Sequence, residues 1–200
     1  MKIARSFTKF ALAAALTTLS MAAAAQVTLR FGHANSPGEV AYDLYQEFAN
    51  NVNKKSNGQL NIRVFPSEQL GKEVDLLQQL KSGALDISTP SMPTLNIMVP
   101  AFEMPSAPFL WKDWKEAEAV IRGAAMEPIW TELKDKHNIV PLTKIWYWGW
   151  RNFTFTQREV RKPEDMAGLK LRVPDAPLYV MYPKSIGANA TPIKKLGGLA

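Results

Sequence analysis

The chain has no cysteine and only two histidines. Without cysteine there is no disulfide bond, no thiolate nucleophile and no cysteine-ligated metal. His33 and His137 are far apart in the sequence and have no third group at the spacing of a zinc site. A G-x-S-x-G nucleophile elbow and a phosphate-binding glycine loop are also missing. We therefore expect no metal, no cofactor and no enzymatic activity.

The chain also lacks a large excess of charge of one sign. Its formal net charge is +6, and three of the basic residues, Lys2, Arg5 and Lys9, lie at the extreme N-terminus. Without them the chain has 21 basic and 18 acidic residues, a net charge of +3. A net charge this small does not indicate a nucleic-acid partner.

A long apolar run is missing as well. The stretch from Phe10 to Ala25 is shorter than the roughly 20 residues that span a bilayer, and hydroxyl side chains interrupt it. A basic start, an apolar middle and small residues at 23–25 are typical of a signal peptide. We predict that residues 1–25 are removed after Ala25 and that the mature protein is periplasmic, with no membrane-embedded part.

What the chain does contain is an alternation of strand-like and helix-like segments. The two-residue period of Val27–Phe31, Leu60–Val64 and Leu85–Ser88 predicts strands, and helical spacing is found between them at 41–52 and 73–81. This β-α-β-α-β order predicts an α/β fold with a parallel sheet and right-handed crossovers.

Loops at the carboxyl ends of parallel strands form the ligand-binding edge of such sheets. The loops at 33–39 and 89–92 lie there and contain His33, Asn35 and Ser91. His33 is as compatible with the core as with a pocket. Residues 68–71 either enter a helix or contact a ligand, and the sequence leaves both readings open.

The middle of the chain reads as helical. Asp113 and Glu116 form a D-x-x-E capping box before a helix that Gly123 ends, and Pro128 suits the first turn of another. Ile139–Trp148 is predicted to be a strand that leads into a second lobe. We place the boundary near Gly149, with lobe I over 26–149 and lobe II over 150–200.

Arg172 lies in a short predicted strand of that second lobe. Leu171 and Val173 alternate with it, so the guanidinium points away from the apolar face, and Pro174 ends the strand. A guanidinium at a strand end can hold a carboxylate through two parallel hydrogen bonds. An exposed surface arginine is the alternative.

An aromatic run precedes this strand. Trp146, Trp148 and Trp150 share one face of an extended segment, and Arg151 is on the other. The tryptophans are either core residues or, in the case of Trp148, a flat wall on which a sugar ring stacks. Arg151 and Arg172 in one cleft would repel each other unless an anion lay between them.

Several ordered motifs then make a family recognisable. They resemble those of the DctP-type solute-binding proteins of TRAP (tripartite ATP-independent periplasmic) transporters. The motifs are F-P-S-E-Q-L-G at 65–71, K-S-G-A-L-D-I at 81–87, W-G-x-R at 148–151, P-E-D-M-A-G-L-K-L-R-V-P at 163–174 and G-A-N-A-T-P at 187–192.

The resemblance implies a two-lobed periplasmic binding protein fold of the type II kind, and delivery of the ligand to membrane permease subunits. Arg172 matches the family's carboxylate clamp and Arg151 its second arginine, while Asn35 and Ser91 fall in contact loops. Family members continue beyond the motif that ends at Pro192, so we expect lobe II to be incomplete and the protein to be truncated at its C-terminus.

We therefore expect a periplasmic subunit that captures an organic acid, with a sugar acid such as a uronate favoured over a small dicarboxylate. Three alternatives stay open: an extracytoplasmic sensor or scaffold with the same fold, an inactive truncated product, and an exported hydrolase. A neighbouring pair of permease genes would favour transport over sensing.

Overall fold

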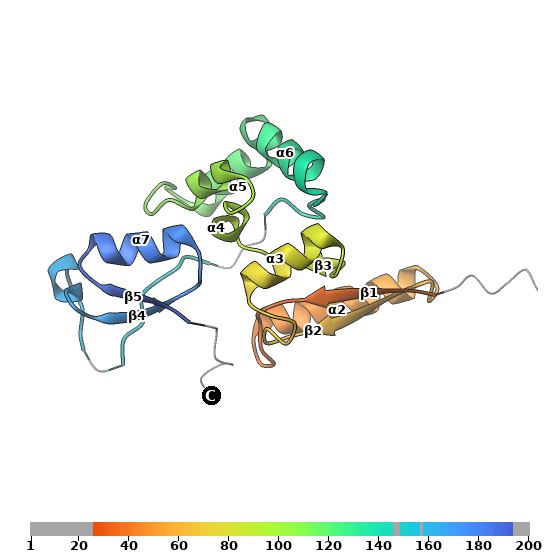
Figure 1. The fold of residues 1–200 in the computed structure, drawn as a ribbon, viewed down its shortest axis with the longest axis horizontal. Helices are drawn as coiled ribbons and strands as arrows, with labels where there is room; N and C mark the ends of the chain where they lie inside the picture. The colour runs from red at the N-terminus through yellow and green to blue at the C-terminus, as the bar shows by residue number, and fades with distance from the viewer. Residues whose placement is uncertain (1–25, 146–148, 157, 194–200) are drawn as a thin grey trace, which may run out of the picture.

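The computed structural model describes residues 26–145, 149–156 and 158–193 (Figure 1). The predicted signal peptide and its cleavage site lie outside these residues and stay predictions. Within the described ranges, no helix has both the length and the apolar character needed to cross a bilayer.

The first sheet is parallel and has three strands in the order β2-β1-β3. Its strands are β1 (Val27–Gly32), β2 (Leu60–Phe65) and β3 (Ile87–Ser88), joined by α2 (Val40–Lys55) and α3 (Glu73–Ser82). The predicted α/β alternation is confirmed, although β3 is shorter than expected. One face of the sheet packs on α2 through a cluster of Phe31, Ala41, Tyr45, Ala49 and Ile62.

A helical layer follows, shown in green in Figure 1. It comprises α4 (Met92–Leu95), η2 (Pro100–Ser106), α5 (Trp114–Arg122), η3 (Ala124–Met126) and α6 (Glu127–His137). Its core is the largest cluster of buried side chains, and Leu77 of α3 joins it. The other members are Leu95, Val99, Phe102, Ala117, Ile121, Met126, Trp130, Leu133 and Ile145.

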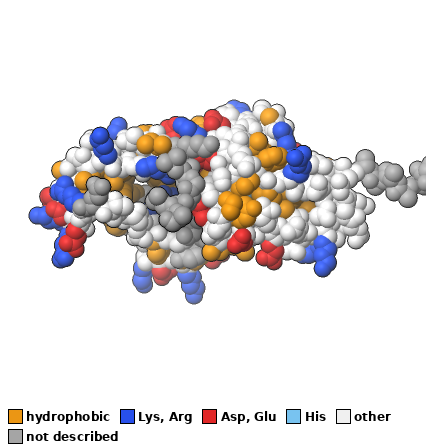
Figure 2. Space-filling view, turned by 90° about the horizontal axis from the view of Figure 1, so that it is seen from below, with side chains coloured by type: hydrophobic (Ala, Val, Ile, Leu, Met, Phe, Trp, Pro, Cys, Tyr) orange, Lys and Arg blue, Asp and Glu red, His pale blue; other side chains and the backbone are white. Residues whose placement is uncertain are grey.

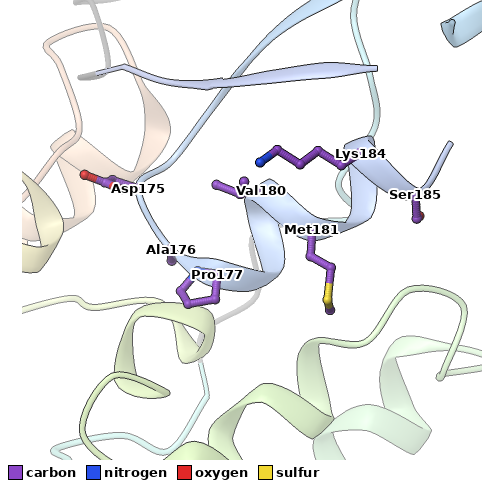
Figure 3. Close-up of a pocket in the computed structure, with 7 residues that line it drawn as sticks. All are labelled: Asp175, Ala176, Pro177, Val180, Met181, Lys184 and Ser185. Atoms are coloured by element: carbon purple, nitrogen blue, oxygen red, sulfur yellow. The ribbon is translucent and has the colours of Figure 1, made fainter. Parts of the chain in front are cut away.

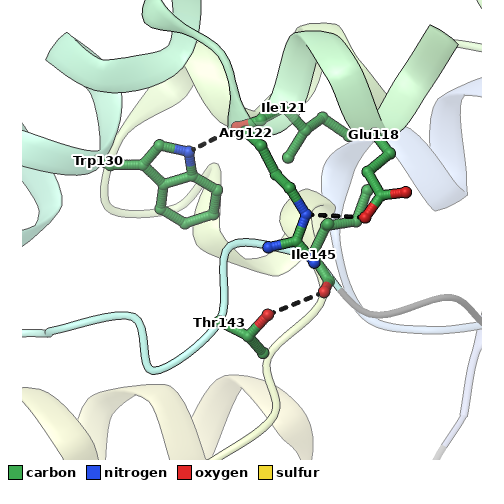
Figure 4. Close-up of polar contacts among 6 residues, drawn as sticks. All are labelled: Glu118, Ile121, Arg122, Trp130, Thr143 and Ile145. Atoms are coloured by element: carbon green, nitrogen blue, oxygen red, sulfur yellow. Dashed lines mark hydrogen bonds and ion pairs between the residues drawn. The ribbon is translucent and has the colours of Figure 1, made fainter. Parts of the chain in front are cut away.

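The helix signals of the sequence are confirmed here. The Asp113 carboxylate accepts a hydrogen bond from the Glu116 amide at 2.9 Å, as an N-cap does. The reciprocal bond to the Glu116 carboxylate comes from the Lys112 amide, one residue before the cap. The Trp130 indole donates to the Ile121 carbonyl at 3.1 Å and ties α6 to the end of α5 (Figure 4).

The strand predicted at Ile139–Trp148 is wrong over its described part, because residues 139–145 form no strand. Pro141 lacks an amide hydrogen for a ladder, and the Thr143 hydroxyl bonds to the Ile145 carbonyl at 3.0 Å (Figure 4). Ile139 and Ile145 pack on the helical core instead of forming a sheet. Residues 146–148 lie outside the described residues.

The second sheet is smaller. η4 (Pro163–Met166) leads into β4 (Lys170–Val173), and α7 (Pro177–Ser185) connects β4 to the parallel strand β5 (Asn189–Pro192). Pro183 lies inside α7. Met166, Leu171 and Ala188 form the buried core of this part.

The two sheets point the carboxyl ends of their strands toward each other across the middle of the molecule (Figure 1). The described contacts between the lobes include an ion pair and a ring pair: Lys72 Nζ lies 3.8 Å from Asp175 Oδ2, and the rings of Phe109 and Tyr182 are 6.3 Å apart. On the face shown in Figure 2, basic and acidic side chains are interspersed. The two-lobed arrangement is therefore present, with binding edges that face each other.

Candidate functional site

Arg172 is one residue from the carboxyl end of β4, and its side chain lies on the exposed side of the strand, as predicted. Leu171 and Val173 are buried on the other side. The Arg172 Nε–H donates to the Ile193 carbonyl at 2.8 Å, just beyond β5. That bond orients the guanidinium from its Nε side, so a carboxylate would be held by the two terminal nitrogens.

Arg151 is held by α7. Its guanidinium lies 4.6 Å from the centre of the Tyr179 ring, and Nη2 donates to the Tyr179 hydroxyl at 3.4 Å. The ring therefore orients Arg151 by a cation–π contact, to which the long hydrogen bond adds little. Tyr179 is a residue that the sequence reasoning missed. Its position in the first turn of the helix after β4 was the signal that could have revealed it.

Arg172 is influenced by charges from three segments of the chain. Partial burial lowers the pKa of the Arg172 guanidinium, the carboxylates of Glu68 and Glu73 raise it, and the charge of Arg151 lowers it. The two arginines are therefore near enough to repel each other, as the sequence analysis expected, but the acidic residues from the first lobe were not anticipated.

Glu68 lies in the loop that follows β2 and is only 5% exposed. Ser67 and Glu68 both have left-handed backbones, with φ of 54° and 55°. The Ser67 amide donates to the Asn35 carbonyl at 2.9 Å, and the Glu68 amide donates to the His33 carbonyl at 3.1 Å. The loop thus leads into α3, as one of the two readings had it, and it is fastened to the loop after β1.

Glu73 starts α3, and its carboxylate accepts a hydrogen bond from the Ser91 amide. The Ser91 hydroxyl is 2.9 Å from the hydroxyl of Thr94. These contacts fix Ser91 at the start of α4, next to the carboxyl end of β3. A ligand contact from Ser91 stays a prediction.

Asn35 and His33 are both buried, at 4% and 1% exposure. The Asn35 side-chain amide donates to Glu39 at 2.7 Å, and its backbone amide donates to His33 Nδ1 at 3.1 Å. The His33 ring packs beside Phe31 and Tyr45, with centroids 5.3 and 4.7 Å away. These contacts favour the core reading of His33, and a ligand role for either residue stays a prediction.

Trp148 lies outside the described residues, so its proposed stacking role stays a prediction. Within the described ranges, no three His, Asp or Glu side chains lie close enough together to hold a metal ion.

A shallow hollow of about 670 Å³ lies along α7 (Figure 3). Pro177, Val180 and Met181 give it an apolar lining, with Lys184 and Ser185 at one end and Asp175 at the other. The hollow does not include either arginine. Because anion recognition needs the guanidinium groups, we place the candidate site at the strand ends instead.

The candidate site therefore combines Arg172, Arg151 and Tyr179 of the second lobe with Glu68, in the loop after β2, and Glu73, at the start of α3. Guanidinium groups can bind an organic anion, and carboxylates can accept hydrogen bonds from its hydroxyls. The described side chains of this arrangement are suited to recognition of an organic anion.

The sequence profile of the family described as "Bacterial extracellular solute-binding protein, family 7" (DctP) matches residues 31–195, most of the chain. The chain belongs to this family. DctP-family members are solute-binding proteins, and the family is periplasmic.

Relatives within the DctP family agree with this assignment. The sialic acid-binding periplasmic protein SiaP of Vibrio cholerae is 34% identical over 90% of this chain and 56% of its own length. A TRAP periplasmic solute-binding protein of Ochrobacterium anthropi, solved with L-fuconate, is 27% identical with a TM-score of 0.78, covering 85% of this chain and 56% of its own.

A third DctP-family relative, from Chromohalobacter salexigens, was solved with D-glucuronate. It is 30% identical with a TM-score of 0.74, and the match covers 83% of this chain and 55% of that one. The chain thus spans little more than half the length of these relatives. Their two-lobed fold is the one seen here, with the second lobe incomplete.

Proposed function

We propose that this protein is the ligand-capturing subunit of a TRAP-type uptake system, that it binds a sugar acid, and that Arg172 holds the ligand carboxylate. The observation that carries the proposal is the position of Arg172 at the carboxyl end of β4, beside Arg151 and opposite the first lobe. The ligands of the three relatives, sialic acid, L-fuconate and D-glucuronate, all combine one carboxylate with several hydroxyls.

The magnitudes are compatible with this role. A charge-assisted hydrogen bond contributes about 1.5–3 kcal/mol, and micromolar affinity needs about 8 kcal/mol in total. A two-bond clamp on the carboxylate would therefore supply a large part of the affinity. Hydroxyl contacts to the first lobe would supply the remainder.

We further propose that residues 1–25 direct export, that cleavage leaves Gln26 at the N-terminus, and that the captured ligand passes to membrane permease subunits. The sequence pattern of the first 25 residues supports export, and family membership supports the permease partner. Mass spectrometry of the exported protein would test the cleavage site directly.

The test of the main proposal is calorimetric titration of the purified 200-residue chain with sialic acid, L-fuconate and D-glucuronate, alongside Arg172→Ala. We expect one of these acids to bind, and the substitution to cost about 3–5 kcal/mol of affinity, because it leaves a desolvated carboxylate without its partner.

Arg172→Lys is the matched variant, because it keeps the positive charge and loses the two-bond geometry. Its affinity for the acid should therefore lie between those of the unmodified chain and Arg172→Ala. A loss below tenfold for Arg172→Ala would reject the clamp. Binding of none of the acids would reject the proposed function.

A further inference from the structure

The loop at residues 66–72 has one acidic side chain, Glu68, whose charge acts on Arg172 of the second lobe. The Lys72–Asp175 ion pair holds the end of this loop against the segment that follows β4, three residues beyond Arg172. Figure 3 shows Asp175 extending away from α7 on that side. Glu68, four residues before Lys72, therefore lies in the part of the first lobe that faces the binding edge of the second.

Glu68 is fixed there by its backbone. Its amide bonds to the loop after β1 and its carbonyl accepts from the Gly71 amide at 3.1 Å. Its left-handed conformation is one that residues other than Gly, Asn and Asp rarely adopt. Only 5% of the Glu68 surface is exposed, so its side chain lies inside the protein and not in bulk solvent.

The carboxylates of Glu68 and Glu73 act on the Arg172 guanidinium from the first lobe, and Arg151 acts on it from the second. The nearby cation Lys72 is already paired with the carboxylate of Asp175. One ligand carboxylate can be held by the arginines. A second ligand carboxylate would lie near Glu68, Glu73 and Asp175, whose carboxylates carry charge of the same sign and would repel it.

We infer that Glu68 is a specificity-determining residue that selects hydroxylated monocarboxylates and rejects dicarboxylates. This inference rests on the proposed function and narrows its substrate class. The effect of Glu68 on the Arg172 pKa agrees with it, because that carboxylate contributes more than any other charge acting on the guanidinium. Neutral hydroxyls suffer no such repulsion and can donate to a carboxylate.

The experiment compares two ligands that differ in one group. D-gluconate carries a hydroxyl at the end where D-glucarate carries a second carboxylate, and both are fully ionised at pH 7.5. Affinities of the 200-residue chain are measured by calorimetry at low salt. We expect gluconate to bind at least about tenfold more tightly than glucarate, since a like-charge contact is costly.

Glu68→Gln should lower the ratio of gluconate affinity to glucarate affinity at least about threefold, chiefly because glucarate binds more tightly. Glu68→Asp keeps the charge and should keep most of the preference. Glu47→Gln removes the same charge from the exposed face of α2 and should leave the ratio unchanged. Thermal unfolding identifies any variant that fails to fold, and Glu68→Gly, which removes the same charge and suits the left-handed backbone, then takes the place of Glu68→Gln.

Equal binding of gluconate and glucarate by the unmodified chain would overturn the inference and leave the proposed function intact. An unchanged ratio in folded Glu68→Gln would do the same. If neither these two acids nor the acids tested above bind, both proposals fall. The two failures are therefore distinguishable.

Discussion

The two sheets differ in how much of each is buried. The first has three strands, a helix packed along one face and a large helical core beside it. The second has two strands and a core of three buried residues, yet it carries Arg172, Arg151 and Tyr179. The better-packed lobe thus provides the scaffold, and the less-packed lobe carries the two arginines. This follows the general pattern in which ligand-binding elements lie in regions of low local stability.

Core truncation should show the difference most clearly. Leu77 is fully buried in the helical core, whereas Leu171 is 8% exposed in the small one. We expect Leu77→Ala to lower the free energy of unfolding by about 3–5 kcal/mol and Leu171→Ala by about 2–3 kcal/mol, because a small core collapses more easily around a cavity. Urea unfolding measures both. A larger cost at Leu171 would contradict the ranking of the two lobes.

A substitution in the loop that faces the second lobe should have the next largest effect. Gly71 has φ of +125°, and a Cβ added there would lie 2.8 Å from Asp75 Cβ. We expect Gly71→Ala to cost about 1–3 kcal/mol of unfolding free energy. Gly38→Ala is the control, since Gly38 also has a positive φ but nothing within 4 Å of an added Cβ. Equal thermal shifts for the two variants would argue against the steric clash.

The smallest effect should come from Arg151, whose side chain is exposed and oriented by one ring. Arg151→Ala should weaken binding of the sugar acid by about 0.2–1 kcal/mol, the range of an exposed ion pair between a guanidinium and a carboxylate. Tyr179→Phe keeps the ring and should change affinity little, because the hydroxyl contact is long. A loss at Arg151 as large as at Arg172 would show that the arginines share the carboxylate equally.

The parts of the structure that the sequence predicted correctly depend on local patterns. Alternation at Leu171, Arg172 and Val173 is enough to put the guanidinium on the exposed side of its strand, because the period of a strand is two. The cap at Asp113 is equally local, since the bond spans three residues. Both predictions needed no knowledge of distant segments.

The parts that failed or were missed depend on tertiary contacts. Ile139 and Ile145 are residue types that favour strands, but here both pack against the helical core. The bond from the Ser91 amide to Glu73 joins residues 18 positions apart, and the Glu68 carboxylate raises the pKa of Arg172 from the other lobe. No periodicity in the sequence encodes either interaction.

The consecutive left-handed residues Ser67 and Glu68 have a consequence for how this chain would evolve. Glycine would adopt either backbone conformation with less strain, at a difference of about 1–2 kcal/mol per residue. In a library randomised at these two positions and selected for heat resistance alone, glycine and asparagine should therefore be enriched at both. Selection for growth on a sugar acid in excess dicarboxylate should instead return glutamate at position 68. The two selection pressures would pull this loop in opposite directions.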